Sequence, residues 1–155
     1  MAYKTKPSTI LLRGNDAQFK ELPLEPLNIY GVGGITPGML CVRTSTNTVK
    51  PHAAATAATT PIFAVENLLL GKGIDDDYDL DGEAVLLVYA ERGDEVYALL
   101  EAGSGNDAVI GDLLESNGAG LLQKGSTGPI ARALEHIDND PGTNSLPMRI
   151  RVEVM

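Results

Sequence analysis

Apolar residues along the chain fall in short runs of strand length that are separated by turn residues. The clearest pattern lies in residues 148–154, where Met, Ile and Val alternate with Arg and Glu. Successive side chains of a strand point to opposite faces, so this alternation predicts a half-buried strand.

Residues 84–89 are apolar at every position, which predicts a central strand with both faces buried. The Arg92-Gly93-Asp94 turn follows, and residues 96–100 are predicted to return as the partner strand of a hairpin. Two further short strands are predicted at 38–43 and 61–66. The predicted fold class is therefore mainly β, with few short helices.

The first thirty residues differ from the rest because proline interrupts them at Pro7, Pro23 and Pro26. Proline has no backbone N–H and restricts the residue before it. Glycines at 31, 33 and 34 then predict a flexible hinge. These features predict an extended N-terminal arm over 1–30 and a single β-rich domain over 31–155.

The predicted domain contains a possible internal repeat, in which the same series of three strands occurs twice. Each series has a strand that begins at a glycine, a short apolar strand, and a strand that ends in Ala-aliphatic-Glu. The two sets are 37–40, 49–50 and 64–66, followed in the same order by 110–114, 122–124 and 133–135. The identities are few, so a chance match and a structural repeat both remain open. A true repeat would indicate two β-units that close on each other as a small barrel or clip, which removes exposed sheet edges.

Composition narrows the class of protein further. A chain of 155 residues is the usual size of one domain, and only 5% of its residues are aromatic, so the core must be aliphatic. The single cysteine, Cys41, cannot form an internal disulfide and is read as a small core residue. No apolar run approaches the ~20 residues of a membrane span, and no signal peptide is indicated at the N-terminus.

The charge is negative overall but unevenly distributed. The net charge is −9, and residues 66–115 hold 14 acidic residues against Lys72 and Arg92. Such a surface disfavours binding to nucleic acid and to anionic membranes, which both require basic patches. The start of the chain has the opposite sign, with Lys4, Lys6 and Arg13. This segment is expected either to reach onto another acidic surface or to fold back on the acidic body of its own chain.

One acidic string has the beginning of a calcium loop. Asp77, Asp79 and Asp81 alternate and are followed by a glycine, so their oxygens could converge on a cation. The twelfth position of such a loop is Val88 rather than a glutamate. A solvated acidic loop is the favoured interpretation, no metal site is predicted, and the three aspartates remain weak candidates.

The sequence contains no motif typical of an active site, so we predict no enzyme and no cofactor. The glycine-rich strings lack the spacing of phosphate-binding loops. Among isolated acidic residues in apolar strands we single out Glu66 and Glu135. Both are interpreted as residues that cap strand ends, pair with Arg or Lys, or face a neighbouring subunit. His52, His136 and Cys41 do not have the spacing of a zinc site.

An ordered series of short motifs resembles the head decoration, or capsid cement, proteins of tailed bacteriophages. The resemblance covers about residues 30–155, and its motifs lie at 37–40, 51–53, 61–67, 71–78, 111–116 and 131–135. It implies a small β-barrel or β-tulip-like domain that assembles as a homotrimer. It also implies a location on the outer surface of the virion, at junctions between capsomers, where the protein stabilises the major capsid protein shell.

The resemblance assigns contacts to the N-terminal arm, with the shell or with a neighbouring subunit. In this chain, Ile10, Leu11 and Leu12 could add a strand to the edge of a sheet. Lys4, Lys6 and Arg13 would favour an acidic surface. These six residues form the predicted capsid or subunit interface, with the major capsid protein and further copies of the chain as partners.

Two other classes of function remain open. The first is a small-ligand or carbohydrate-binding β-barrel module, in which the acidic loop at 75–83 could coordinate calcium. The second is a small hydrolase with dispersed carboxylates, for which the sequence shows no clustered residues.

Overall fold

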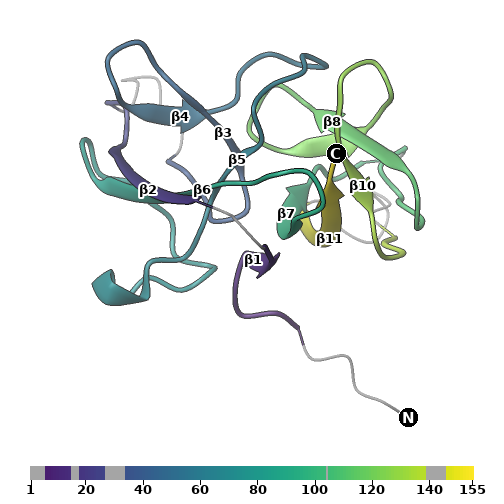
Figure 1. The fold of residues 1–155 in the computed structure, drawn as a ribbon, viewed down its shortest axis with the longest axis horizontal. Coiled ribbons are helices and arrows are strands. Elements are labelled where there is room, and N and C mark those ends of the chain that lie inside the picture. The colour runs from purple at the N-terminus through teal and green to yellow at the C-terminus, as the bar shows by residue number, and fades with distance from the viewer. Residues whose placement is uncertain (1–5, 15–17, 27–33, 104, 139–145) are drawn as a thin grey trace.

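A computed structural model describes residues 6–14, 18–26, 34–103, 105–138 and 146–155. The chain forms two β-units that follow each other in sequence and lie side by side (Figure 1). The predicted fold class, mainly β with a small barrel, is confirmed. The one helical element among the described residues is a 3₁₀ turn, η1 (Leu68–Leu70).

The first unit contains five strands. They are β2 (Gln18–Pro23), β3 (Leu40–Arg43), β4 (Val49–Pro51), β5 (Ile62–Ala64) and β6 (Ala84–Tyr89). Their order in the sheet is β2-β6-β5-β3-β4, with antiparallel neighbours. The sheet returns on itself through a parallel bridge between Leu24, just after β2, and Val49 in β4.

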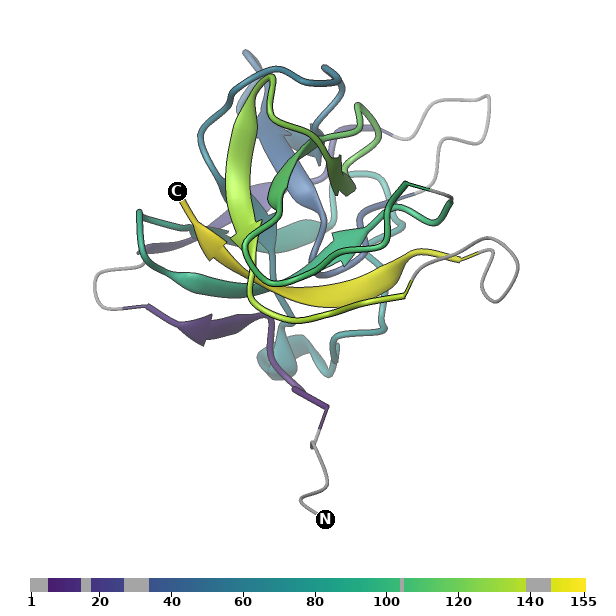
Figure 2. The ribbon, with the colours of Figure 1, turned by 90° about the vertical axis from the view of Figure 1, so that its right-hand side faces the viewer.

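The second unit also contains five strands, and its sheet closes into a barrel. They are β7 (Glu95–Leu100), β8 (Leu113–Ser116), β9 (Leu122–Lys124), β10 (Pro129–Ala133) and β11 (Met148–Val154). Their order is β7-β11-β10-β8-β9, and a parallel pairing of Leu100 with Leu122 joins the last strand to the first. Figure 2 looks onto this unit and shows β11 (yellow) crossing its front.

The two units have the same topology, strand for strand. If β2–β6 are matched in order with β7–β11, the sheet order, the closing parallel pair and the register all coincide. The turns match as well: Gly38 N–H donates to the carbonyl of Ala64 at 2.8 Å, and Gly111 N–H donates to that of Ala133 at 2.9 Å. The repeat seen in the sequence is therefore structural, but each unit closes on itself instead of the two closing into one barrel.

The packing follows the same duplication. The first core has an apolar counterpart in the second at every position, for example Leu24 with Leu100 and Val85 with Ile150. The members of the first core are Leu22, Leu24, Ile35, Cys41, Val49, Ile62, Ala64, Tyr78, Val85 and Leu87.

The outer face of the first sheet joins the two units. Leu40, Phe63 and Val88 point away from the first core and are fully buried in the same apolar cluster as the interior of the second unit. The strand β6 therefore buries both faces, as the apolar run at 84–89 predicted.

The predicted hairpin of 84–89 with 96–100 is wrong. The strand β6 pairs with β2 and β5, whereas β7 pairs with β1, β11 and β9 in the other unit. The turn between them therefore connects the two units. The prediction failed because a hydrophobic pattern identifies strands but does not identify their partners.

The predicted arm boundary at residue 30 does not match the packed body. The whole of β2 pairs with β6, and Leu22 and Leu24 are buried in the first core. The strand β1 (Leu11–Arg13) is added to the edge of β7. Pro23 is compatible with this arrangement because proline is tolerated at the end of a strand. Residues 31–33 of the predicted glycine hinge lie outside the described residues, whereas Gly34 packs closely against the backbone of Tyr78.

The duplication provides a matched pair of glycines for testing the packing between units. Gly38 and Gly111 have φ values of +98° and +97°, but a Cβ atom on Gly38 would lie 3.0 Å from the carbonyl oxygen of Tyr97, whereas one on Gly111 would meet nothing within 4 Å. We expect Gly111→Ala to lower the free energy of unfolding by about 1–2 kcal/mol through backbone strain alone. Gly38→Ala should cost more, and urea unfolding measures both. Equal losses would contradict close packing of the two units at Gly38.

Candidate functional site

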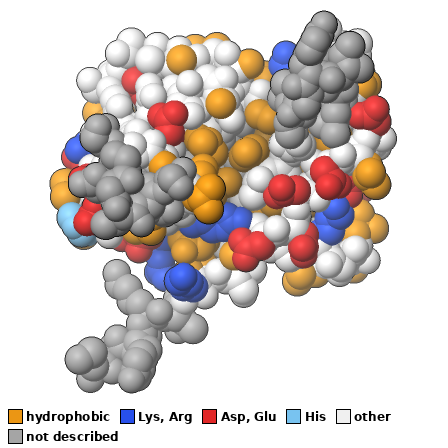
Figure 3. All heavy atoms as spheres, turned by 180° about the vertical axis from the view of Figure 1, so that it is seen from behind, with side chains coloured by type: hydrophobic (Ala, Val, Ile, Leu, Met, Phe, Trp, Pro, Cys, Tyr) orange, Lys and Arg blue, Asp and Glu red, His pale blue; other side chains and the backbone are white. Residues whose placement is uncertain are grey.

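A groove of about 800 Å³ lies between the two units. Its walls come from the turn at Thr36 and Met39, the loop at 74–77, strands β7 and β11, and Lys6 near the start of the described chain. Figure 3 shows one face of the molecule, on which basic side chains gather in the lower middle with acidic side chains beside them. Sequence reasoning missed this groove, because its residues are far apart in the chain.

The lining combines apolar and charged groups. Its apolar members include Met39, Ile74, Leu99, Leu121, Ile137 and Met148. The charged members are Lys6, Arg149, Arg151, Asp75, Asp77 and Glu135, so three positive groups face three negative ones. In a chain of net charge −9, the groove is therefore locally neutral.

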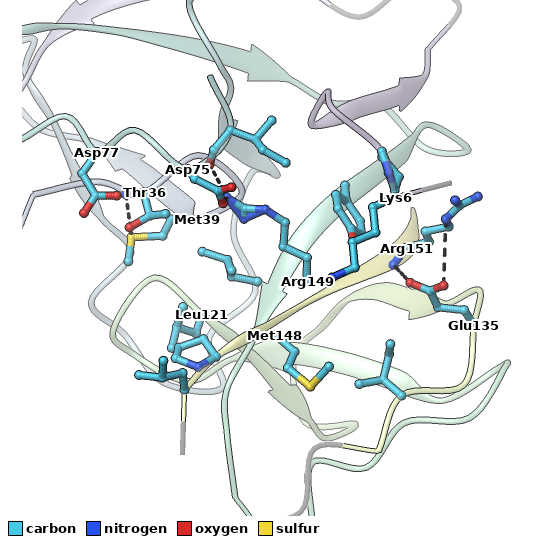
Figure 4. Close-up of a pocket in the computed structure, with 17 residues that line it drawn as sticks. Lys6, Thr36, Met39, Asp75, Asp77, Leu121, Glu135, Met148, Arg149 and Arg151 are labelled. Atoms are coloured by element: carbon cyan, nitrogen blue, oxygen red, sulfur yellow. Dashed lines mark hydrogen bonds and ion pairs between the residues drawn. The ribbon is translucent and has the colours of Figure 1, made fainter. Parts of the chain in front are cut away.

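Arg149 of β11 ties the two units together at one end of the groove. Its side chain is only 10% exposed, donates to the backbone carbonyl of Ile74, and lies 3.4 Å from a carboxylate oxygen of Asp75 (Figure 4). Burial lowers the pKa of the Arg149 guanidinium, and the negative charge of Asp75 opposes this shift. Because Asp75 is 91% exposed, water screens the ion pair, and the carbonyl contact holds the guanidinium in place.

Glu135 occupies the other end of the groove and has a structural role. One carboxylate oxygen accepts the backbone N–H of Arg151 at 2.9 Å, and the other lies 3.9 Å from Nε of the same residue. Burial raises the pKa of the nearby Tyr97 phenol, and the charge of Glu135 raises it further. Glu66, at the equivalent position of the first unit, accepts the backbone N–H of Ile10 at 3.0 Å. Glu135 therefore pairs with a basic residue, one of the roles expected for it, and Glu66 binds the residue just before β1.

A third carboxylate, Glu115, was missed in the sequence. It lies in β8 and is 4% exposed, and one of its oxygens accepts the backbone N–H groups of Thr127 and Gly128, both at 2.9 Å. The available signal was a single acid directly after two leucines in a predicted strand. Its carboxylate holds the turn before β10.

The acidic loop does not gather its aspartates. Asp77, Asp79 and Asp81 are all exposed, and no group of three or more metal-ligating side chains occurs among the described residues. The loop is instead organised by Glu83, which accepts the N–H groups of Asp79 at 2.9 Å and Leu80 at 3.2 Å.

Glu83 also forms an ion pair with Lys72, with 2.5 Å between Nζ and the carboxylate oxygen. Burial raises the pKa of Glu83, but the hydrogen bonds from Lys72 and from the backbone outweigh this effect and lower it. The charged form of Glu83 is therefore favoured, and it fixes the geometry of the loop.

The structure separates the six predicted interface residues. Lys4 lies outside the described residues. Ile10 is fully buried in its own chain, and Leu11 and Leu12 of β1 are half-buried. Leu11 lies opposite Val96, so this strand completes a sheet of the same chain. Lys6 and Arg13 stay exposed; Lys6 lines the groove and Arg13 lies 3.9 Å from Glu95.

A buried polar pair spans the two units away from the groove. Nδ1 of His52 lies 2.7 Å from Oγ of Ser116, and His52 is 5% exposed. Burial lowers the pKa of His52, which favours the neutral ring. Cys41 is also fully buried, which raises the pKa of its thiol to about 12 and agrees with its predicted place in the core.

No protein-family model matches the chain, and no curated protein is significantly similar to it. Within the described ranges, no helix is long and apolar enough to cross a membrane.

The lowered pKa of His52 predicts that the free energy of unfolding decreases in mild acid. Because the folded-state pKa lies below the ordinary value of 6.5, its contribution is complete above that pH and decreases as the pH falls below it, where the unfolded chain takes up the proton first. We expect His52→Gln to flatten the pH dependence of the melting temperature between about pH 7 and pH 5.5. The exposed His136 provides the control His136→Gln, and equal profiles for the two variants would contradict this role.

The hydrogen bonds of Glu115 predict that removal of its side chain lowers the stability of the fold. Glu115→Ala leaves the N–H groups of Thr127 and Gly128 without their partner and should lower the free energy of unfolding by about 1–3 kcal/mol, measured by urea denaturation. Glu91→Ala, at an exposed carboxylate, is the control and should change little. A loss no greater than that of the control would contradict the role of Glu115.

Proposed function

We propose that this chain is a structural protein of a tailed-phage virion. It binds the outside of the head, stabilises the major capsid protein shell, and acts as a homotrimer at capsomer junctions without enzymatic activity. The observation that carries the proposal is the ordered series of motifs that resembles head decoration proteins.

The positions of the motifs support this proposal. The segments 37–40 and 111–116 contain the equivalent turns that lead into β3 and β8. The segment 61–67 contains β5, and 131–135 contains the end of the equivalent strand β10. Four of the six motifs therefore lie at equivalent positions of the duplicated framework. A resemblance based on framework positions concerns the whole domain instead of a single loop.

The hydrogen bonds of the buried carboxylates also support a structural, non-catalytic role for the protein. Glu66, Glu115 and Glu135 each accept backbone N–H groups of their own chain. Such carboxylates position strands and turns, and this accounts for them without catalysis. A cement protein gains affinity from several copies that bind together, because linked contacts raise the effective concentration.

The charge distribution agrees with a place outside the head. A chain of net charge −9 is repelled by DNA, and the exposed Arg13 near its N-terminus offers a positive charge to an acidic shell surface. Residues 6–13 run along the second unit, with Lys6 and Pro7 at the groove and β1 on β7. This edge is the proposed face toward the shell.

The groove favours a second candidate, a module that binds a small ligand or a carbohydrate. Its volume lies in the range of small-ligand sites, and Tyr97, Arg149 and Glu135 provide an aromatic ring and polar groups beside apolar residues. A calcium-dependent form would lose several kcal/mol of stabilisation in excess EDTA, so thermal melting with and without the chelator separates that form from the first candidate.

Arg13 gives a direct test of shell binding. Arg13→Glu should raise the apparent Kd for undecorated expanded heads about tenfold, because every copy in a trimer loses a favourable charge at the contact. Arg92→Glu is the matched control, with the same charge change at an exposed turn, and should bind as the wild type does. Binding is measured by cosedimentation with the heads. Equal binding of the two variants would contradict the predicted interface, and no binding by the wild type would contradict the proposed function.

A further inference from the structure

The strand β2 has one side that pairs with β6 and one side that no described strand covers. Leu24 N–H donates to the carbonyl of Glu83 at 2.7 Å, so the even-numbered residues of this strand face β6. Backbone groups alternate in direction along an antiparallel strand, and Phe19 and Glu21 therefore face away from β6. Their N–H groups have no hydrogen-bond acceptor among the described residues. This side of β2 at Phe19 and Glu21 is called the free edge below.

In the second unit the equivalent edge is covered by a strand. Tyr97, the counterpart of Glu21, donates its N–H to the carbonyl of Ile10 at 2.7 Å. The strand β1 continues this pairing, with Leu11 opposite Val96. The duplicated fold thus accommodates an added antiparallel strand at this position. The first unit has the same backbone arrangement, and no described strand lies beside it.

Neither β1 nor a second copy of β2 suits the free edge. Ile10 is fully buried beside β7, so β1 of any copy would have to leave its own core to reach β2. Two β2 strands that pair through Phe19 and Glu21 would place Lys20 opposite Lys20 of the second copy, where like charges repel. Lysine and proline on an edge strand typically prevent such self-pairing, and β2 has Lys20 and Pro23. The free edge therefore favours a strand from a different protein.

The side chains around the free edge define the strand that fits it. Phe19 is 56% exposed, and Lys20 is exposed on the opposite face of β2. Asn67 donates its side-chain amide to Glu21 at 3.2 Å, which holds the exposed leucines of η1 beside the face that Glu21 shares with Phe19. A matching strand presents an apolar residue to Phe19 and a carboxylate to Lys20, because cross-strand pairs of these kinds are stabilising.

We propose that the free edge of β2 binds an extended segment of the major capsid protein, which adds to the sheet as an antiparallel strand. The segment carries an apolar residue opposite Phe19 and an acidic residue opposite Lys20. Backbone hydrogen bonds to Phe19 and Glu21 provide affinity, and the two side-chain pairs provide specificity.

The inference rests on the proposed function and names a second contact with the shell. The free edge lies close to the first contact along the chain. Gln18 begins β2 five residues after Arg13, a length of chain that spans at most about 18 Å. One shell surface can therefore meet both contacts.

A pair of substitutions at Glu21 separates the backbone from the side chain. Glu21→Pro removes the N–H that points away from β6, so the pairing with β6 should remain, as it does at Pro23. Glu21→Ala removes the same side chain and keeps the N–H. In cosedimentation of the full chain with undecorated expanded heads, Glu21→Pro should have an apparent Kd about tenfold higher than Glu21→Ala. Circular dichroism and the melting temperature check that both variants fold.

Lys20→Glu tests the acidic residue of the partner strand. The substitution places two negative charges opposite each other and should raise the apparent Kd for the heads about three- to tenfold. Arg92→Glu makes the same change of charge at an exposed turn and should bind as the wild type does.

Hydrogen exchange of the wild type reports the new strand directly. In the free chain, the N–H groups of Phe19 and Glu21 should exchange faster than those of Lys20 and Leu22, which face β6. On the heads, Phe19 and Glu21 should lose this fast exchange, because their N–H groups are then hydrogen-bonded.

The outcomes separate this inference from the proposed function. Equal binding of Glu21→Pro and Glu21→Ala, equal binding of Lys20→Glu and Arg92→Glu, or unchanged exchange at Phe19 and Glu21 on the heads would each overturn the added strand. The proposed function would stand in these three cases, because the wild type still binds. A wild type that does not bind heads would overturn both.

Discussion

The burial of one sheet face against the other unit determines most of the structure. Leu40, Phe63 and Val88 project from the outer face of the first sheet and pack in the apolar cluster of the second unit. Removing such side chains from water stabilises the joined state by about 1.5–3 kcal/mol each. Two small barrels, each with a limited core, thereby become one body, and the groove lies along their junction.

The duplicated positions explain why the two units differ in chemistry. By register, Phe63 and Val88 correspond to Arg132 and Glu153, and Leu86 corresponds to Arg151. Buried apolar positions of this face in the first unit are therefore charged and partly exposed in the second, although Leu40 keeps an apolar counterpart in Leu113. Arg151, on this changed face, also lines the groove. One positive charge of the groove, Arg151, thus stands where the first unit has Leu86.

Much of the fold could be predicted from the sequence, because local patterns reflect local structure. The runs at 84–89 and 148–154 became strands with those bounds, and the weak echo between the halves marked a true duplication. The pairing of β6 and β7 was predicted wrongly because a tight turn can join two units as well as two strands of a hairpin. The predicted N-terminal arm extends too far along the chain. The prolines at 23 and 26 favoured an irregular segment, but β2 lies there and pairs with β6.

The site could be predicted far less well. Asp77, Asp79 and Asp81 have the spacing of a calcium loop, but their side chains are exposed. Glu83, which is not part of that pattern, holds the loop by accepting the N–H of Asp79 and pairing with Lys72. The groove combines residues from both ends and the middle of the chain, and Ile10 became a core residue instead of an interface. Contacts between distant segments depend on topology, which a linear pattern does not contain.

One backbone atom limits how far the tandem arrangement can extend. Leu99 N–H of β7 donates to the carbonyl of Gly38 at 3.1 Å, which helps to seat the first unit on the second. The residue equivalent to Leu99 in the first unit is Pro23, which has no N–H to donate. A further unit that approached the first in the same way would lack this bond, and the free end of the second unit presents charged side chains. The first unit therefore lacks the backbone donor with which the second unit holds its neighbour.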